Sequence, residues 1–248
     1  MHGLGARPSI PDQRDFIYRP TVLRPNLLME IDLRTDGPLV WDQGELGSCV
    51  PHGVLGAVNY AEKYESNTVL SPSALFTYYV GREIEGTVDY DSGLYVRDGI
   101  KAVNSAGVAT RWDWQYDISR FTEKPPAKAY QEATLERAIE YSRVTSLDMV
   151  NVALQEKLPV VFGVTVFDSF FYVGSDGMVP TPSGTERPAG GHCMLIVGWR
   201  PQDNRFIVRN SWGTGWGDEG FCYMESRYLD PYNPWAFASD FWTIKKVS

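Results

Sequence analysis

The chain has 248 residues, 43% of them hydrophobic and 22% charged, which is enough apolar material for one large core or two apposed lobes. Its formal net charge of −8 disfavours nucleic-acid binding, because an acidic surface repels phosphate backbones. The sequence holds no run of about 18 apolar residues, so it predicts no transmembrane helix and no membrane partner.

Cysteine usage is sparse. Three cysteines form no disulfide framework, so we expect the core alone to hold the chain, which suits a reducing compartment. Three histidines and the lack of a Cys-x-x-Cys pair lead us to expect neither a metal site nor a cofactor. The first residues lack the basic and apolar regions of a Sec signal. We therefore expect a cytoplasmic protein, or one exported by a non-Sec route.

The N-terminal region is rich in Pro and Arg. Prolines disfavour any long helix in residues 1–26, so we predict an extended N-terminal extension, called the arm below. The folded body is expected to begin with the segment Ile31–Arg34.

Helical patterns dominate the first half of the chain. Residues 48–64 are predicted to form a helix, with Ser48 as its N-cap and Pro51 in the first turn, where a missing N–H costs little. Apolar residues at helical spacing support this assignment. Further helices are predicted over residues 71–80 (capped by Ser71), 95–105 and 130–142.

From Leu158 onward the composition becomes β-branched and apolar, as in buried strands. Strands are predicted over residues 159–167, 192–199, 206–210 and 220–224. Helices in one half and strands in the other predict an α+β fold. We expect a helical lobe over residues 27–125 and a β-rich lobe over residues 126–248.

Four side chains carry candidate chemistry. Cys49 would lie in the first turn of its helix, where backbone N–H groups and the helix dipole favour a thiolate. His192 in contact with it would complete a thiolate–imidazolium pair, and Asn210 would orient the ring by accepting its N–H. The amide of Gln43 and the backbone N–H of Cys49 are candidate donors to an oxyanion. These parts indicate a cysteine-nucleophile hydrolase.

The same residues stand in three blocks: 43–49, 190–192 and 210–220. Together these blocks resemble the papain-like cysteine peptidases (peptidase family C1) over about residues 28–225. In that family a Gln lies six residues before the Cys, and the His and Asn come from a right, β-rich lobe. The resemblance implies a papain-like two-lobed fold, with a helical left lobe that contains the nucleophile helix and a β-barrel-like right lobe. It also implies a peptidase that needs no cofactor and acts on peptides or proteins.

The resemblance further implies a substrate-binding surface. Gly93 would hydrogen-bond an extended substrate backbone, and Leu94 would border the main specificity pocket, S2. Gly163 would lie near the floor of that pocket, which favours an apolar side chain two residues before the scissile bond. Gly191 and Trp212 complete the set, and Trp212 would exclude water from the His–Asn hydrogen bond.

The sequence departs from the family beside the nucleophile. Leu46 stands where the family usually has a disulfide-bonded Cys, and Val50 replaces an aromatic residue. His52 is a weak candidate for modulating the site, and Asp91 is expected in a solvated loop. Cys193 is expected to be a buried small side chain.

Several alternatives stay open at this point. The chain could be a cysteine endopeptidase acting through a thioester, an exopeptidase or a transpeptidase-like acyl-transfer enzyme of the same fold, or a papain-fold binding module without turnover. The arm could lie in the cleft as a short pro-segment, or pack on the back of the body.

Overall fold

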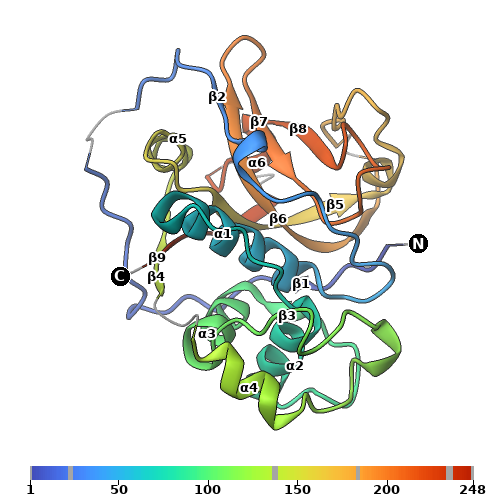
Figure 1. Ribbon diagram of the computed structural model, residues 1–248. Helices are drawn as coiled ribbons and strands as arrows, with labels where there is room; N and C mark the ends of the chain where they lie inside the picture. The colour runs from blue at the N-terminus through green and yellow to red at the C-terminus, as the bar shows by residue number, and fades with distance from the viewer. Residues whose placement is uncertain (1, 22–24, 136–138, 183–184, 233–236, 247–248) are drawn as a thin grey trace.

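The computed structural model describes residues 2–21, 25–135, 139–182, 185–232 and 237–246. A β-sheet lies on one side of helix α1 (Cys49–Ser66), and further helices lie on the other side (Figure 1). These helices are α2 (Ala74–Glu85), α3 (Val96–Ala106) and α4 (Ala127–Ala133). The arrangement is α+β, as the sequence predicts.

The sheet is antiparallel and has seven strands in the described part of the chain. Six follow one another in the order β4 (Ile139–Arg143), β9 (Ala238–Lys246), β5 (Val160–Phe167), β6 (Pro188–Arg200), β7 (Arg205–Arg209) and β8 (Phe221–Glu225). β2 (Ile31–Asp32) pairs with β6, although it belongs by sequence to the predicted helical lobe. The register sets Val164 of β5 opposite His192 of β6.

Two smaller helices accompany the sheet, and three short 3₁₀ helices lie in its connections and in those of the helical lobe. α5 (Leu147–Gln155) packs on β5 and β6, and α6 (Ser226–Leu229) follows β8. The 3₁₀ segments are η1 (Arg34–Asp36), η2 (Ile118–Arg120) and η3 (Asp168–Tyr172). Within the described residues, no helix is both long and apolar enough to cross a membrane.

Most predicted elements are confirmed, with shifted ends, but the helix predicted over residues 130–142 is wrong. α4 ends at Ala133, and residues 139–143 form strand β4, which pairs with β9 over five residues. Pairing with a distant strand overrides the local helical pattern there. The second helix is capped by Ser73, whose side chain accepts the N–H of Phe76, and not by the predicted Ser71.

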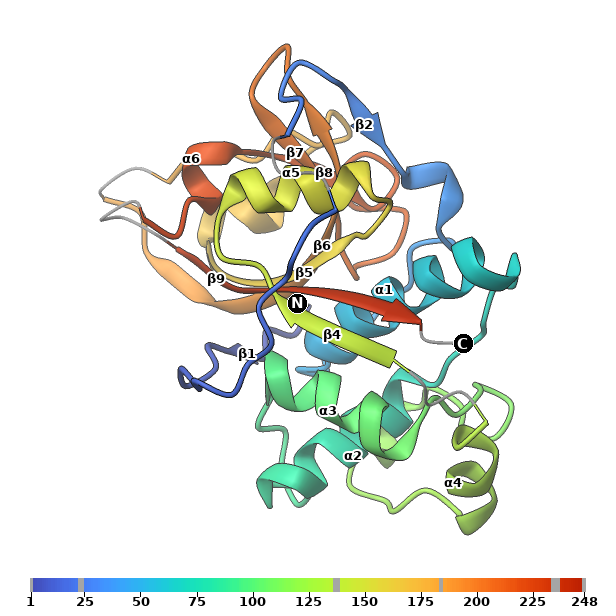
Figure 2. The same ribbon diagram turned by 90° about the vertical axis from the view of Figure 1, so that its left-hand side faces the viewer.

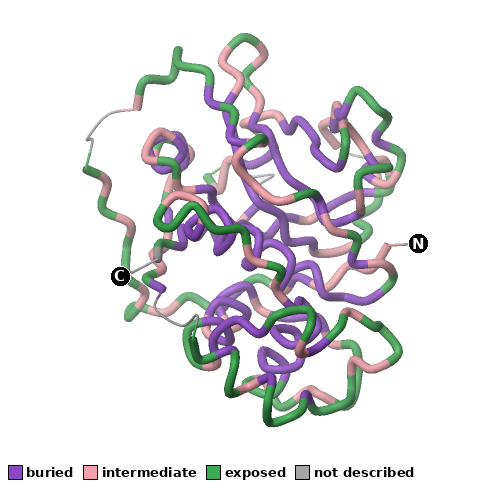
Figure 3. The backbone as a smooth tube through the Cα atoms, in the orientation of Figure 1, coloured by how far each residue is buried: buried purple, intermediate pink, exposed green. Residues whose placement is uncertain are grey.

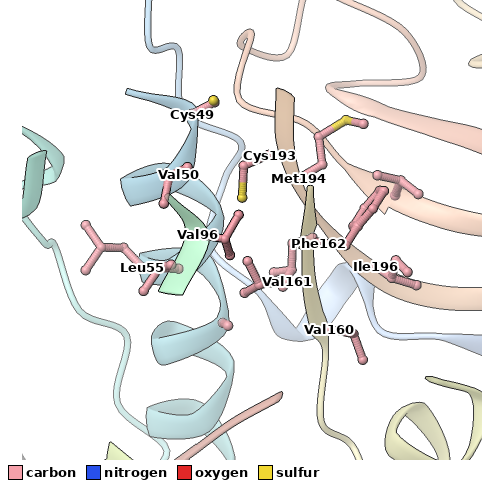
Figure 4. Close-up of a cluster of buried hydrophobic side chains, with 14 of the residues drawn as sticks. Cys49, Val50, Leu55, Val96, Val160, Val161, Phe162, Cys193, Met194 and Ile196 are labelled. Carbon is pink, nitrogen blue, oxygen red and sulfur yellow. The ribbon is translucent and has the colours of Figure 1, made fainter. Parts of the chain in front are cut away.

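Helix α1 is buried on nearly every side, because both layers pack against it (Figure 3). Glycines on its sheet-facing side permit a close approach to β6: a Cβ added at Gly53 would lie 3.0 Å from the Sγ of Cys193. Figure 4 shows Cys49 at the beginning of α1 and Cys193 on the facing strand. The packing therefore brings the first turn of α1 to the strand that carries His192.

The arm is extended, as predicted, and follows the body along two separate stretches (Figure 2). Its first stretch forms β1 (Ala6–Arg7), which pairs in parallel with β3 (Leu94–Tyr95). Farther along, Asp15 forms ion pairs with Arg97 and Arg143.

Candidate active site

Cys49 is the first residue of α1 and is fully buried. Burial raises the pKa of its thiol to about 11, while the backbone N–H groups of Cys193, Gly5 and Val50 act in the opposite direction. The contact with the N–H of Cys193 brings the thiol to the strand position next to His192. The sulfur and the imidazole that the sequence separates by 143 residues therefore come from adjacent parts of the fold.

His192 lies on β6 with no exposed surface. Its Nε2 is 2.7 Å from the Oδ1 of Asn210, an oxygen that also accepts the backbone N–H of Ser211 at 2.8 Å. Since an amide oxygen only accepts, Nε2 is the protonated ring nitrogen. Nδ1 is buried and has no hydrogen-bond partner among the described residues, so it is left as a base.

The protonation states differ from those predicted by the sequence. Burial lowers the pKa of His192 to about 4, although the hydrogen bond with Asn210 acts in the opposite direction. Together with the raised pKa of Cys49, this favours a neutral thiol and a neutral imidazole at neutral pH. The thiolate–imidazolium pair is disfavoured while the site is covered.

Gln43 is buried and its amide is fixed at both ends. Its Nε2 donates to the backbone oxygen of Leu46 at 2.8 Å and to that of Gly3 in the arm at 3.0 Å. Its Oε1 accepts the hydroxyl of Ser211 at 2.5 Å. No role was predicted from the sequence for Ser211, although it lies between the two candidate residues Asn210 and Trp212.

Trp212 covers the imidazole, as predicted from the sequence. Its ring centroid is 5.0 Å from that of His192, and only 2% of the residue is exposed. Phe170, Phe171 and Trp216 pack around the same indole. The two phenylalanines lie in η3, where no motif drew attention to them.

The arm bonds to the strand that was predicted to bind the substrate backbone, but it does so through Leu94 and not through the predicted Gly93. Gly93 donates its N–H to the hydroxyl of Tyr78, whereas the N–H of Leu94 donates to the backbone oxygen of Gly5 at 2.8 Å. Gly93 has a φ of +66°, and a Cβ there would lie 2.0 Å from the same oxygen. The side chain of Leu94 is buried against Gly81 and does not border the neighbouring cavity.

A cavity of about 230 Å³ opens beside this strand. Gly163 and Gly191 both line it, together with Ser239 from β9. A Cβ added at Gly191 would lie 2.0 Å from the backbone oxygen of Ala6, so only glycine leaves space for the arm at that position. The structure thus groups Gly163 and Gly191, two of the three glycines that the sequence assigned to substrate binding, whereas Gly93 does not line this cavity.

Residues 2–7 of the arm contact the candidate groups from one end of the site to the other. The ring of His2 stacks on Trp212 with centroids 5.0 Å apart, and the N–H of Gly3 donates to the oxygen of Gly44 at 3.0 Å. Residues 2–7 of the arm thus lie against Gln43, Leu94 and Trp212, three residues that the sequence assigns to the site.

Hydrogen bonds hold the loop before the nucleophile where the family usually has a disulfide. The N–H of Gly47 donates to both carboxylate oxygens of Asp91, at 3.0 and 3.2 Å, and the hydroxyl of Tyr78 donates to the same carboxylate. Asp91 is exposed, as predicted for a solvated loop, but its carboxylate joins this loop to the helical lobe.

His52 contacts the end of the same loop. Its Nδ1 is 2.9 Å from the oxygen of Ser48, and its ring packs edge-on against Trp41 and Tyr116. Burial lowers the pKa of His52 to about 4, which keeps it neutral. The hydroxyl of Tyr116 donates to the oxygen of Gln43, so these aromatic residues support the loop that carries the amide.

Comparison with known proteins identifies the class. The family model described as papain family cysteine protease matches residues 28–231. An uncharacterized peptidase C1-like protein of Acanthamoeba polyphaga mimivirus is 38% identical over 245 residues, which cover 94% of this chain and 75% of that protein. The chain therefore belongs to the papain family of cysteine proteases.

Other relatives agree with this assignment. Bovine (Bos taurus) cathepsin S and Carica papaya chymopapain are 27% and 25% identical, and the matches span only 54% and 58% of their lengths. Among solved structures, xylellain, a cysteine protease from Xylella fastidiosa, superposes with a TM-score of 0.87 at 34% identity, covering all of this chain and 97% of that one. These likenesses confirm the papain-like fold and support the prediction of a cysteine-type peptidase.

Proposed function

We propose that the chain is a cysteine endopeptidase that hydrolyses peptide bonds through a thioester on Cys49. The observation that carries the proposal is the state of His192: Nε2 is held by Asn210, and the buried Nδ1 is free to accept a proton. His192 takes the thiol proton and delivers it to the leaving amine as the C–N bond breaks; it then activates the water that hydrolyses the thioester. Gln43 and the N–H of Cys49 stabilise the oxyanion.

In this proposal the arm keeps the cleft closed to substrate. The carbonyl of Gly3 accepts from Gln43, the donor assigned to the oxyanion, and the carbonyl of Gly5 accepts from the strand assigned to the substrate backbone. The burial that results also favours the neutral thiol–imidazole pair. An exposed cleft and a charged pair are therefore expected only after residues 2–9 leave.

A fluorogenic peptide library tests both parts. We expect the full chain to cleave slowly, and a chain with residues 2–8 deleted to cleave faster, because the deletion removes the carbonyls of Gly3 and Gly5. Cys49→Ala in either chain should abolish cleavage and labelling by an epoxide thiol inhibitor. Equal rates with and without the native arm sequence would refute inhibition by the arm, and cleavage that survives Cys49→Ala would refute the nucleophile.

The same experiment separates the alternatives. Cleavage within long peptides indicates an endopeptidase, whereas release of terminal residues only indicates an exopeptidase. Formation of a new amide with an added amine indicates acyl transfer. A folded, open chain that binds peptides without epoxide labelling indicates a binding module.

A further inference from the structure

One arm side chain occupies a charged seat beside the cleft. Arg7 forms an ion pair with Glu85, the last residue of α2, whose side chain is only 5% exposed. The other carboxylate oxygen of Glu85 accepts the N–H of Tyr95 at 2.9 Å. The guanidinium of Arg7 lies 4.2 Å from the centroid of the Tyr95 ring. The carboxylate of Glu85 and the ring of Tyr95 thus form a binding site for a cation, called the seat below.

The seat is unfavourable for a carboxylate without a cation. A carboxylate at the C-terminal end of a helix faces the negative end of the helix dipole. With Arg7 in place the Glu85 side chain is almost completely covered, and a covered carboxylate costs free energy unless a cation neutralises its charge. When the arm leaves the cleft, Glu85 loses the guanidinium of Arg7, and the N–H of Tyr95 is the bond that remains to it. A positively charged side chain from another source would restore the lost interaction.

The position of this seat along the cleft follows from the arm. Gly5 lies against Gly47 of the nucleophile loop, and Ala6 and Arg7 both border the cavity lined by Gly163. The guanidinium of Arg7, however, contacts Glu85 and Tyr95, neither of which lines that cavity. If that cavity takes the residue two positions before the scissile bond, the seat lies one residue farther from the nucleophile. It corresponds to the third residue before the bond that is cut.

We infer that Glu85 and Tyr95 form a subsite for an arginine or lysine side chain at the third position before the scissile bond. This rests on the proposed peptidase function for the direction of the substrate. The arm places Arg7 in the seat as an internal ligand, and a basic substrate residue takes over the same ion pair and ring contact. An arginine fits better than a lysine, because its planar group can stack on the ring and bridge the carboxylate.

Binding without turnover tests the subsite. The protein is the chain with Cys49→Ala and with residues 2–8 deleted, so that the anchor at Asp15 is retained. The probes are two fluorescent peptides, acetyl-Arg-Ala-Gly-Gly amide and the same peptide with citrulline, the uncharged isostere, in place of arginine. We expect the arginine peptide to bind at least about tenfold more tightly at low ionic strength.

Substitutions at Glu85 identify the carboxylate as the cause. Glu85→Gln should bring the two affinities together, Glu85→Asp should keep part of the difference, and Glu85→Lys should favour a peptide with glutamate at that position. The full-length chain with Cys49→Ala, Gly5→Ala and Arg7→Ala is the second protein, in case the deletion variant does not fold; the Cβ at residue 5 would lie 2.1 Å from the backbone oxygen of Gly47 and so displaces the arm. Equal affinities, a preference that survives Glu85→Gln, or no binding by either protein would overturn the subsite.

Hydrolysis by the matched chains that retain Cys49 is scored separately. Failure to cleave any peptide, with the arginine preference in binding intact, would refute the proposed function and leave the subsite standing. Cleavage without that preference would do the opposite.

Discussion

The two halves of the arm are held by different kinds of contact. The inner half, residues 2–9, contacts the candidate catalytic and substrate-binding residues through its backbone: the carbonyls of Gly3 and Gly5 accept hydrogen bonds from Gln43 and Leu94. The side chain of Arg7 adds an ion pair with Glu85, outside these residues. The outer half, residues 10–21, is held mainly through buried charged side chains, above all the pair of Asp15 with Arg97.

This difference separates occupation of the cleft from anchoring. Any extended peptide presents carbonyl and N–H groups like those of the inner half, so a substrate can replace it. No ordinary substrate presents a carboxylate at the place of Asp15. An anchored outer half keeps the inner half at a high effective concentration, of the order of millimolar for a short tether, and a substrate must compete with it.

The largest effect is expected when the anchor is removed. Asp15→Ala leaves Arg97 and Arg143 without their shared carboxylate, and breaking a buried pair costs about 3–5 kcal/mol. The loss should appear as detachment of the outer half, measured by hydrogen exchange at the N–H of Tyr18, which bonds to the oxygen of Arg143. Asp12→Ala is the control, because Asp12 pairs with the exposed Arg14.

Two results would contradict the anchoring role of Asp15. Faster exchange at Tyr18 after Asp12→Ala, or unchanged exchange after Asp15→Ala, would show that the outer half has no specific anchor.

The inner half can be displaced by a single methyl group. A Cβ at Gly5 would lie 2.1 Å from the backbone oxygen of Gly47, which lies in the nucleophile loop and has little freedom to move. Gly5→Ala should therefore remove the hydrogen bonds of the inner half, worth about 3 kcal/mol together, and raise alkylation of Cys49 about 100-fold. Mass spectrometry distinguishes Cys49 from the buried Cys193. Ile10→Ala, at an exposed arm position, should leave the rate unchanged.

In a chain with Cys49→Ala, where the ring of His192 has no thiolate to pair with in the open state, acid should open the inner half before the outer half. The pKa of His192 is about 4 under the arm, against about 6.5 for an exposed imidazole. Between pH 4 and pH 6.5, His192 is protonated in the open state and neutral in the closed state, so closure releases a proton. The closed state is therefore most stable above pH 6.5 and loses stability as the pH falls toward 4. At pH 5 the ratio of open to closed molecules should be about 30-fold higher than at pH 8.

Methyl signals in nuclear magnetic resonance spectra separate the two halves. Ala6 reports on the inner half, and Ile17, which bridges to Arg143, reports on the outer half. The Ala6 signal should change between pH 6.5 and 4 while that of Ile17 persists. In His192→Gln the Ala6 signal should lose this dependence; a dependence that remains would assign the acid effect to another group.

The sequence predicts the nucleophile helix and the central strands because their patterns are local. An N-cap, a proline in the first turn and an apolar stripe suffice for α1, and β-branched runs suffice for β5 and β6. β4 is different, because its strand conformation depends on pairing with β9, about 100 residues later. No local pattern carries that information.

The candidate site likewise has features that local sequence predicts and features that depend on distant segments. The residue types and their order point to Cys49, His192 and Asn210, since few arrangements of thiol, imidazole and amide suit another chemistry. The protonation states depend on burial by the arm, and the supporting hydroxyl of Ser211 depends on a meeting of two distant loops. Both are tertiary properties, which one sequence read segment by segment does not contain.

The smallest effect is expected at Gln43, whose amide contacts the inner half and also takes part in the proposed chemistry. Ser211 donates to the Oε1 of Gln43 and so aims its Nε2 at the carbonyl of Gly3. In the open Gly5→Ala chain, Ser211→Ala should lower kcat/KM about fivefold, because one hydrogen bond of about 1 kcal/mol no longer fixes the oxyanion donor. Ser211→Thr, which keeps the hydroxyl, should retain most of the activity. An equal loss in both variants would attribute the effect to packing, and Gln43 would then be positioned by its backbone alone.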